Sequence, residues 1–588
     1  TVSVLFPAIK VLGEGKLERI FYLTARTVGR TVAEKACADL RRSGLRLRSL
    51  TLTAKEKICV QDGQPCDPQT CPLAKGYYDR RMPAMREALA CEALTRTELE
   101  EIGRRHQVCP FELGLDVSMW VDAVICDYNY AFDPKVYLRR HFGERTGDYV
   151  FLVDEAHNLV DRAREMFSAR LGSQEVQEVR RAIKTGVPRC ARALSKLNTA
   201  MRAVCGQGAQ EEIPEPSETL ELDLFKKQES AAPTESVSIR GEFRVSREIP
   251  GELLERVEAA LKEAETWLAR NEPAEYRESL LGLYFNLLSF RRTAELYDEH
   301  YVCLAGQFNR ASEIRLFCLD PSALLQEALQ RGKAAVLFSA TLTPLEYYRD
   351  LLGGTQQDPA MRLASPFPPE NLAVLVQDRI RTEFKARQAS MQQVVQAVAT
   401  VVASRPGNYM VYGPSYDYLS KVRESFDSLH LPGVRILAQQ PEMSEADRDR
   451  FLATFAEEHE ETLVGFAVMG GIFGEGIDLL GDCLIGAVIL GVGLPQLCVE
   501  RDLIRDYFQA KLGTGFDYAY TFPGMNRVLQ AIGRVIRSET DRGVVLLLDA
   551  RFGQGRYRNL FPAWWRPETV RSESELEQAL ERFWRSVP

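Results

Sequence analysis

Apolar runs that end in polar residues recur along this 588-residue chain and constrain its fold more than any other feature. Such a run is typical of a buried parallel strand, whose carboxyl end lies at the binding edge of an open sheet. Helical patterns separate the runs, so the sequence predicts an α/β fold with two parallel sheets. The runs form an early and a late group: 18–27, 120–130, 148–157 and 333–341, then 408–416, 434–439, 463–471, 484–493 and 543–551.

The composition is that of a globular protein, with 45% hydrophobic, 27% charged and 9% aromatic residues. These values exclude disorder as the main state, collagen and coiled coil. The most apolar stretch, 483–495, is shorter than the roughly 20 residues that a membrane span needs. Thirteen cysteines are too sparse for a disulfide scaffold, and no basic segment precedes the apolar residues 1–9. We therefore expect a cytoplasmic protein with no membrane association.

The acidic charge is concentrated in one stretch, so it does not exclude a nucleic-acid partner. The formal net charge is −8, and eight acids and two lysines in 211–235 supply −6 of it. Binding follows local basic surface rather than the total charge. One segment interleaves cations with aromatic rings, as backbone phosphates and unstacked bases require, although a solvated basic helix explains it equally well. Its residues are Lys75, Tyr77, Tyr78, Arg80, Arg81 and Arg86.

The sequence Asp154-Glu155-Ala156-His157 closes the predicted strand 148–157. An Asp at a strand end suits Mg²⁺ held on ATP phosphates, and the following Glu suits orientation of the attacking water. An acidic strand end that only faces solvent is the alternative, because short motifs match by chance.

Two arginines, Arg534 and Arg537, stand three residues apart in a segment that begins at Gln530. We expect them on one helix face, from which they would reach a γ-phosphate held by a neighbouring domain, or else lie in solvent. Gly533 between Gln530 and Arg534 suggests a close approach, since glycine inside a helix costs roughly 1 kcal/mol. The glycine-rich segment 470–478 follows another strand, where its backbone would approach phosphate or ribose.

Four cysteines, Cys59, Cys66, Cys71 and Cys109, have the spacing C-x6-C-x4-C-x37-C. Four thiolates hold either a [4Fe–4S] cluster or a zinc ion, and the spacing alone does not decide between them. Cys91 lies in the same region and is an alternative ligand, but it stands in a helical pattern, where a buried free cysteine is the simpler interpretation.

Taken in order, these segments resemble the superfamily 2 helicases, and in particular their XPD/DinG iron–sulfur branch. The resemblance covers nearly the whole chain and is weakest from 165 to 300. It rests on the segments KEKIC, CPLAKGYYD, CPFEL, VICDYNYAFDP, VDEAHNL, LFSATLTPL, SPFP, GIFGEGIDL and QAIGRVIRSETDRG.

The resemblance implies an α/β fold with two RecA-like motor domains and two insertions. The first motor domain would comprise 1–50, 111–160 and 301–345, and the second 346–588. An iron–sulfur domain would occupy 51–110 and a helical arch 161–300. Spacing supports the arch, because 182 residues separate the DEAH and Ser339-Ala340-Thr341 (SAT) segments, too many for an ordinary loop.

The resemblance also implies the roles of individual residues. Asp154 would hold Mg²⁺, Glu155 would position water, His157 would link nucleotide state to the SAT segment, and Arg534 and Arg537 would close from the second motor domain. It favours the cluster over zinc on the four cysteines. Residues expected at ATP are Thr1, Gly476, Asp478 and Gln530, and those expected at the DNA backbone are Thr24, Arg26 and Tyr416.

The implied activity is ATP-dependent DNA unwinding, 5′→3′, on single-stranded and forked DNA, in repair or replication-associated unwinding. One departure is serious, since the phosphate-loop pattern GxxxxGK[ST] does not occur in this sequence. Thr1 resembles the last residue of that loop, so we expect the lysine upstream of it and little ATPase activity without it. Two alternatives are a nucleic-acid-binding module that does not turn over ATP and a redox-responsive switch governed by the cluster.

Overall fold

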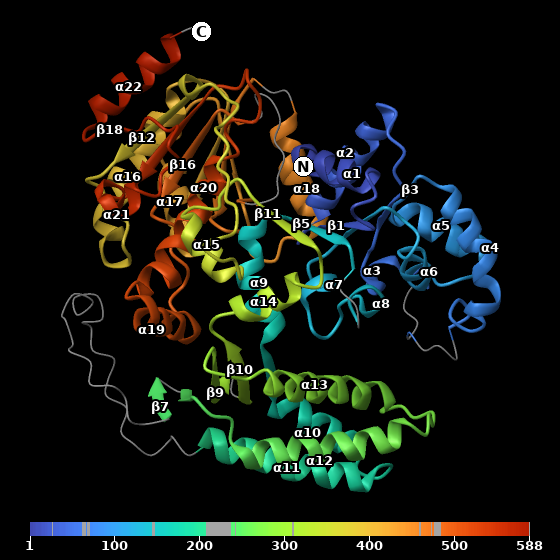
Figure 1. Cartoon of the computed structure of the whole chain (residues 1–588). Helices are drawn as coiled ribbons and strands as arrows, with labels where there is room; N and C mark the ends of the chain where they lie inside the picture. Colours follow the sequence, from blue (N-terminus) through green and yellow to red (C-terminus); the bar gives the residue numbers. More distant parts are fainter. Residues whose placement is uncertain are drawn as a thin grey trace.

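The computed structural model contains two parallel sheets and one antiparallel sheet, each covered by helices (Figure 1). It describes residues 1–25, 27–61, 66, 71–143, 147–206, 237–240, 243–308, 311–457, 460–471, 473–474 and 484–586. The predicted α/β fold with two parallel sheets is confirmed. Over the described residues, no helix is both long and apolar enough to span a membrane.

The first parallel sheet has the strand order β11-β5-β1-β4-β2-β3. Side chains alternate between its faces, so Ile20 and Tyr22 pack under α1 and α2, while Phe21 and Leu23 face the opposite core. The strands are β1 (Arg19–Leu23), β2 (Ser49–Thr51), β3 (Ala93–Leu94), β4 (Ala123–Cys126), β5 (Tyr149–Asp154) and β11 (Ala334–Phe338), and the two helices are α1 (Val2–Gly13) and α2 (Thr27–Arg42).

The helices of the cysteine-bearing insertion, residues 51–110, pack against the face of this sheet that carries Phe21 and Leu23. A capping box at Thr95 and Glu98 starts helix α5. Its helices are α3 (Lys55–Ile58), α4 (Tyr77–Ala90) and α5 (Arg96–His106), and α6 (Pro110–Val117), α7 (Asn129–Phe132) and α8 (Arg139–Phe142) lead back to the sheet.

The antiparallel sheet and its helices form a separate layer at the bottom of Figure 1, with their own hydrophobic core. The strand order is β6-β10-β9-β8-β7. Its strands are β6 (Ala169–Gly172), β7 (Val237–Arg240), β8 (Phe243–Ser246), β9 (Tyr301–Phe308) and β10 (Ala311–Cys318), and its helices are α10 (Ser173–Ala182), α11 (Pro188–Gly206), α12 (Gly251–Leu268) and α13 (Arg277–Glu295). Helix α9 (Leu159–Phe167) connects it to β5.

Two expectations for this region differ from the structure. We expected helical structure from 161 to about 300, interrupted by the acidic stretch from 206 to about 240, but β6 and β8 lie in the parts expected to be helical and β7 lies at the end of the acidic stretch. We also expected 301–345 to return to the first parallel sheet, yet β9 and β10 pair with β8 and β6, and only β11 pairs with β5. Alternating burial along β10 was the local signal of an antiparallel strand.

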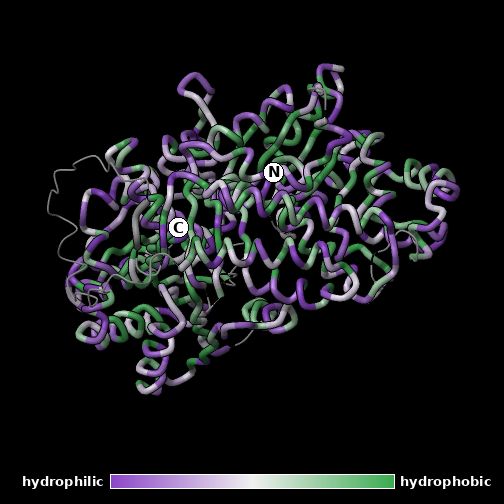
Figure 2. The backbone as a smooth tube through the Cα atoms, turned by 90° about the horizontal axis from the view of Figure 1, so that it is seen from below, coloured by the Kyte–Doolittle hydropathy of each residue, from purple (hydrophilic) through white to green (hydrophobic). Residues whose placement is uncertain are grey.

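The second parallel sheet has the strand order β14-β15-β13-β16-β17-β12-β18 and a hydrophobic core on each face. In Figure 2 hydrophobic segments gather inside the molecule and hydrophilic ones lie along much of its outline. The strands are β12 (Leu372–Gln377), β13 (Asn408–Gly413), β14 (Val434–Ala438), β15 (Thr462–Val468), β16 (Gly486–Leu490), β17 (Gly543–Leu548) and β18 (Glu568–Thr569). Its helices are α16 (Arg387–Ala403), α17 (Tyr416–Asp427), α18 (Glu445–Ala456), α20 (Phe522–Ile532), α21 (Gly555–Arg558) and α22 (Glu573–Arg585).

Helix α19 (Val499–Leu512) lies between β16 and β17 of the second sheet in sequence but shares a core with the first sheet. Its polar side chains pair with the base of the antiparallel layer: Arg501 with Asp161, Glu500 with Arg315, and Lys511 with Asp320. Helices α14 (Ser322–Leu329) and α15 (Leu345–Leu351) complete this contact region. The second parallel sheet is thus tied to the rest of the chain through α19 as well as through the linker after α15.

The contact between Lys511 and Asp320 provides a test of this tie. The ammonium lies 2.8 Å from a carboxylate that is 2% exposed. Burial by itself would raise the pKa of Asp320, but the hydrogen bonds from Lys511 and Ser322 lower it. We expect Lys511→Met to cost about 1–3 kcal/mol of stability, because the buried carboxylate loses its cation.

Thermal melting of both proteins would measure this loss, with Lys421→Met as the control. Lys421 forms an exposed pair with Asp417 and should have almost no effect. The loss for Lys511→Met should be largest near pH 8 and should shrink as the pH falls. Without Lys511, burial raises the pKa of Asp320, so the variant's carboxyl takes up a proton at a higher pH than the wild-type carboxyl, and the protonated form no longer needs a cation. Equal melting of Lys511→Met and wild type would show that α19 is not held by this pair.

Candidate active site

The DEAH residues lie at the carboxyl edge of the first parallel sheet, where β5 ends at Asp154. The Tyr22 hydroxyl, from the neighbouring strand β1, donates to Asp154 Oδ2 at 2.5 Å. The Tyr128 hydroxyl, from the end of β4, donates to the main-chain oxygens of Asp154 and, at 3.0 Å, Glu155. Glu155 adopts φ 49°, a left-handed conformation that is rare for a side-chain-bearing residue and concentrates at functional sites.

The surroundings of Asp154 favour a cation. Burial raises the pKa of this carboxyl, and the adjacent Glu155 charge raises it further, against the hydrogen bond from Tyr22. A cation placed at such a site stabilises the ionised form and reverses the shift. Thr1 lies on the same side: its hydroxyl oxygen is 3.5 Å from the Tyr22 hydroxyl oxygen.

A chain of hydrogen bonds joins Glu155 to the SAT segment. Ser339 Oγ donates to Glu155 Oε2 at 3.0 Å and lies 2.7 Å from His157 Nδ1. A hydroxyl has one hydrogen, so His157 must donate from Nδ1 to Ser339. The neutral ring then presents Nε2 as an acceptor.

The acceptor on His157 faces a residue from the other parallel sheet. Gln530 Nε2, on α20, is within hydrogen-bond distance of His157 Nε2. Gln530 is 8% exposed, and its Oε1 is buried with no hydrogen-bond partner among the described residues. A polar relay therefore runs across the interface from Gln530 through His157 and Ser339 to Glu155.

The helix-face prediction for Arg534 and Arg537 is wrong, since α20 ends at Ile532, Arg534 lies in the turn that follows and Arg537 lies two residues beyond that turn. The buried side chains of Val535 and Ile536 anchor this turn in the core. Both guanidinium charges act on Tyr412, at the end of β13, whose pKa burial raises to about 12. The arginines thus lie near the carboxyl edge of the second parallel sheet.

The other predicted ligand contacts divide into three groups. Thr24 is 1% exposed and packs against Gly29, so its hydroxyl does not face solvent. Tyr416 is 39% exposed, and its hydroxyl accepts from Gln439 at 2.9 Å. Arg26, Gly476 and Asp478 lie outside the described residues.

All four cysteines are among the residues of the insertion that the structure describes. The Cys109 amide donates to the Leu73 carbonyl at 3.1 Å, which brings the segment after Cys71 beside Cys109. Burial by itself would lower the pKa of the Lys55 ammonium, but the neighbouring Cys66 and Cys109 raise it. Among the described residues, no three His, Cys, Asp or Glu side chains are close enough together to hold a metal ion.

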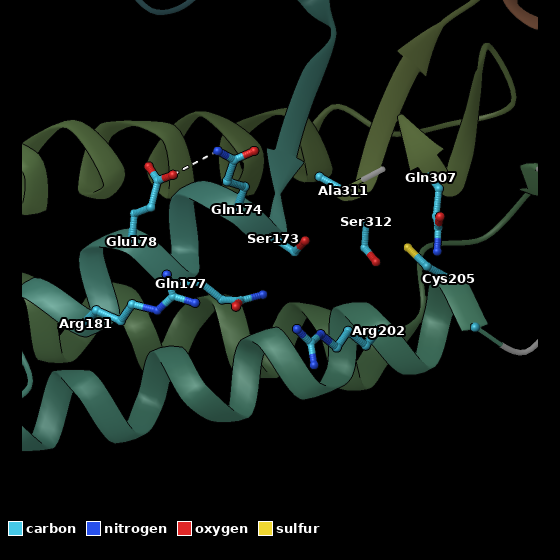
Figure 3. A pocket seen from close by; sticks show the side chains of 11 residues that line it. Ser173, Gln174, Gln177, Glu178, Arg181, Arg202, Cys205, Gln307, Ala311 and Ser312 are labelled. Atoms are coloured by element: carbon cyan, nitrogen blue, oxygen red, sulfur yellow. Dashed lines mark hydrogen bonds between the residues drawn. The ribbon is translucent and has the colours of Figure 1, made fainter. Parts of the chain in front are cut away.

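A cavity of about 620 Å³ lies in the antiparallel layer, between α10, α11 and the β9–β10 hairpin (Figure 3). Its wall includes Arg181, Arg202 and the pair formed by Gln174 and Glu178, whose side chains are 2.9 Å apart. None of the predicted site residues lines it, so this cavity is separate from the DEAH edge.

Tyr22 and Tyr128 are site residues that the sequence analysis missed. The polar run after β4 was the available signal for Tyr128, since it lies at the same sheet edge as DEAH. Tyr22 gave no signal, because an aromatic residue inside a buried strand is ordinary core.

Two family models match the chain. One, DEAD_2, covers 24–176, and the other, described as a helicase C-terminal domain, covers 398–568. A relative from Debaryomyces hansenii, "ATP-dependent DNA helicase CHL1", is 21% identical over 79% of this chain and 60% of its own length. The Schizosaccharomyces pombe "General transcription and DNA repair factor IIH helicase subunit XPD" is 22% identical over 88% of this chain and 76% of its own.

A solved structure titled "XPD_Helicase" has the same fold, with a TM-score of 0.59 and 16% identity over 94% of this chain and 92% of that chain. The chain spans about three fifths of the length of the CHL1 relatives that it matches. The models cover most strands of both parallel sheets and the relatives span most of the sequence, so the chain belongs to the XPD/DinG-type superfamily 2 helicases.

Proposed function

We propose that this chain provides the motor of an ATP-dependent DNA helicase that moves 5′→3′ along single-stranded and forked DNA. The relay from Gln530 through His157 to Glu155 carries the proposal, because it joins the two sheets at the edge where ATP would bind. The names of the relatives support the substrate. The polarity rests on the family resemblance.

The chain's own residues divide the hydrolysis step between them. Asp154 would hold Mg²⁺, which would screen the phosphate oxygens of bound ATP. Glu155, held by Ser339, would accept a hydrogen bond from the attacking water and so orient it. Arg534 and Arg537 would approach the γ-phosphate from the second sheet and stabilise the charge that develops there.

The remaining ligand contacts belong to the same proposal. Thr1, Gly476, Asp478 and Gln530 would contact ATP, and Gln530 Oε1 would gain a partner from bound water or nucleotide. Arg26 and Tyr416 would contact the DNA backbone. Thr24 is left out of this set, because its hydroxyl is buried and its amide donates to the Cys126 carbonyl at 3.0 Å.

We propose the domain division on the same grounds. The two parallel sheets are the motor domains, 51–110 is an iron–sulfur domain, and the antiparallel layer with α10–α13 is the arch. The arch then includes β9 and β10, which moves its end to residue 318.

We further propose that Cys59, Cys66, Cys71 and Cys109 hold a [4Fe–4S] cluster rather than zinc. A set of four thiols suits either centre, and the contact between Cys109 and Leu73 draws two of the four chain positions together. Cluster binding would stabilise the insertion, because a site formed only in the folded state links binding to folding.

Replacement of Glu155 by Gln tests the nucleotide site. The experiment uses an extended protein, in which a phosphate loop with its lysine is added upstream of Thr1. Glu155→Gln should bind a fluorescent ATP analogue as wild type does and lose at least 100-fold of the DNA-stimulated hydrolysis rate. The Gln side chain keeps the shape of Glu but lacks the carboxylate that orients the attacking water. Hydrolysis at the wild-type rate would remove Glu155 from the mechanism.

Replacement of the cysteines by Ser tests the metal centre. Anaerobically purified protein should contain iron and acid-labile sulfide and absorb near 400 nm. Ser at position 59, 66, 71 or 109 should bleach the protein and lower its melting temperature, whereas Cys91→Ser, in the same insertion, should do neither. Stoichiometric zinc without sulfide would contradict the cluster.

Strand displacement tests the activity as a whole. With ATP and Mg²⁺, the extended protein should separate DNA duplexes that carry a 5′ single-stranded tail and leave those with a 3′ tail or none intact. Binding should weaken as salt rises, because phosphate contacts release counterions. Displacement from the 3′ tail alone would reverse the polarity, and DNA-dependent hydrolysis without any displacement would indicate a translocase. An RNA duplex belongs in the same panel to test the choice of DNA.

A further inference from the structure

We propose that Asn526 is a positioning residue that fixes helix α20, and with it Arg534 and Arg537, against the SAT segment. The inference rests on the proposed function for its consequence but on the described contacts for its geometry. Asn526 lies outside the DEAH, SAT and Gln530–Arg537 motifs, and nothing in the local sequence marks it as functional.

The side chain of Asn526 crosses the interface between the two parallel-sheet units. Its Nδ2 lies 2.8 Å from the Thr341 carbonyl, 3.0 Å from Thr341 Oγ1 and 2.6 Å from the Tyr348 hydroxyl. All three residues are buried, with Asn526 5%, Thr341 6% and Tyr348 3% exposed. The amide therefore donates into a dry interface, where an unmet carbonyl or amide would be costly.

Asn526 and Gln530 stand four residues apart on α20, so their side chains project from the same face. Gln530 meets His157, and Asn526 meets Thr341. The Thr341 amide donates to Ser339 Oγ at 3.2 Å, and Ser339 donates to Glu155. Two lines of hydrogen bonds thus leave one face of α20 and converge on Ser339 and Glu155.

Two contacts fix an orientation that one contact leaves free. With Gln530 alone, α20 could still rotate about its contact with His157. With Asn526 held one turn earlier, both the axial position and the rotation of the helix are set. The segment that carries Arg534 and Arg537 begins directly after α20, so its place relative to Glu155 follows from these contacts.

The other face of α20 ties the helix to the second parallel sheet. Met525, Val528 and Ile532 are buried in the core of the second parallel sheet. The helix therefore moves with that sheet, so a shift of the sheet changes the contacts between the polar face of α20 and the SAT segment. Loss of the Asn526 contact should disturb the alignment of the arginines without removing any group that touches ATP.

The test compares Asn526→Asp with Asn408→Asp. Asp keeps the size of Asn but loses the amide donor. Asn408 is a matched control: it is 6% exposed and its Nδ2 donates to the Phe455 carbonyl at 3.1 Å, but it stands at the start of β13, away from the carboxyl edge. Asn526→Gln, which keeps the donor on a longer side chain, serves as the conservative variant.

The first measurement is steady-state hydrolysis by the extended protein with DNA. Asn526→Asp should lower kcat at least tenfold and change the KM for ATP by less than threefold, whereas Asn408→Asp should keep kcat within twofold despite a similar drop in melting temperature. Asn526→Gln should recover part of kcat. Equal losses of kcat in the two Asp variants would reduce Asn526 to an ordinary stabilising residue, and an unchanged kcat in Asn526→Asp would overturn the proposal.

The second measurement uses the 588-residue chain itself and needs no catalytic activity. Amide hydrogen exchange should become faster in Asn526→Asp at both 339–343 and 522–532, which lie on opposite sides of the contact, and should not change there in Asn408→Asp. Faster exchange on one side only would show that Asn526 does not tether the two units. If wild type lacked hydrolysis but exchange changed on both sides, the proposed function would fail and the tether would stand.

Discussion

Helix α20 has an apolar face in the core of the second parallel sheet and a polar face on the carboxyl edge of the first. The rest of the candidate site depends on this division. Glu155 is held by Ser339, Ser339 accepts from His157, and His157 accepts from Gln530 on α20. A shift of the second sheet must therefore move or break a buried hydrogen bond before it reaches the residue proposed to orient water. The contacts convert relative movement of two sheets into a local change beside Glu155.

Both insertions begin at this carboxyl edge, since 51–110 follows the end of β2 and α9 follows the DEAH segment at the end of β5. The antiparallel layer has its own core and is bound to α19 through three ion pairs. The second sheet consequently meets the rest of the chain at two places, α20 on the DEAH edge and α19 on the base of the antiparallel layer. Closing motions of such domains set many catalytic rates, and here any closing motion must accommodate both contacts.

Local sequence patterns predicted much of the fold and part of the site. Buried strands that end in polar residues located Asp154, Glu155 and the two parallel sheets, since strand burial and strand ends leave a signal within a few residues. The pairing of β10 with β6 was missed, because β6 lies more than 130 residues earlier in the chain. Residue type and spacing also placed Arg534 and Arg537 on a helix. In the structure the helix ends at Ile532, because the chain turns at Gly533 and buries the side chains of Val535 and Ile536 in the core.

Residues that act across an interface were the hardest to predict. Tyr22 and Asn526 look ordinary in their own segments, and only the folded structure brings them to Asp154 and Thr341. Gln530 could be predicted through its motif, but its contact with His157 could not. Residue types in the sequence indicated which side chains could act on ATP. Their hydrogen-bond partners could not be predicted, because these depend on how segments far apart in the chain pack together.

The most direct measurement is a cryo-electron microscopy structure of the extended protein with Mg²⁺ and the ATP mimic ADP–beryllium fluoride. The account predicts nucleotide between the carboxyl edges of the two parallel sheets, with Mg²⁺ beside Asp154 and both Arg534 and Arg537 turned toward the phosphate mimic. Nucleotide bound elsewhere, for example in the cavity between α10 and α11, or an α20 that contacts neither His157 nor Thr341 in any nucleotide state, would contradict it.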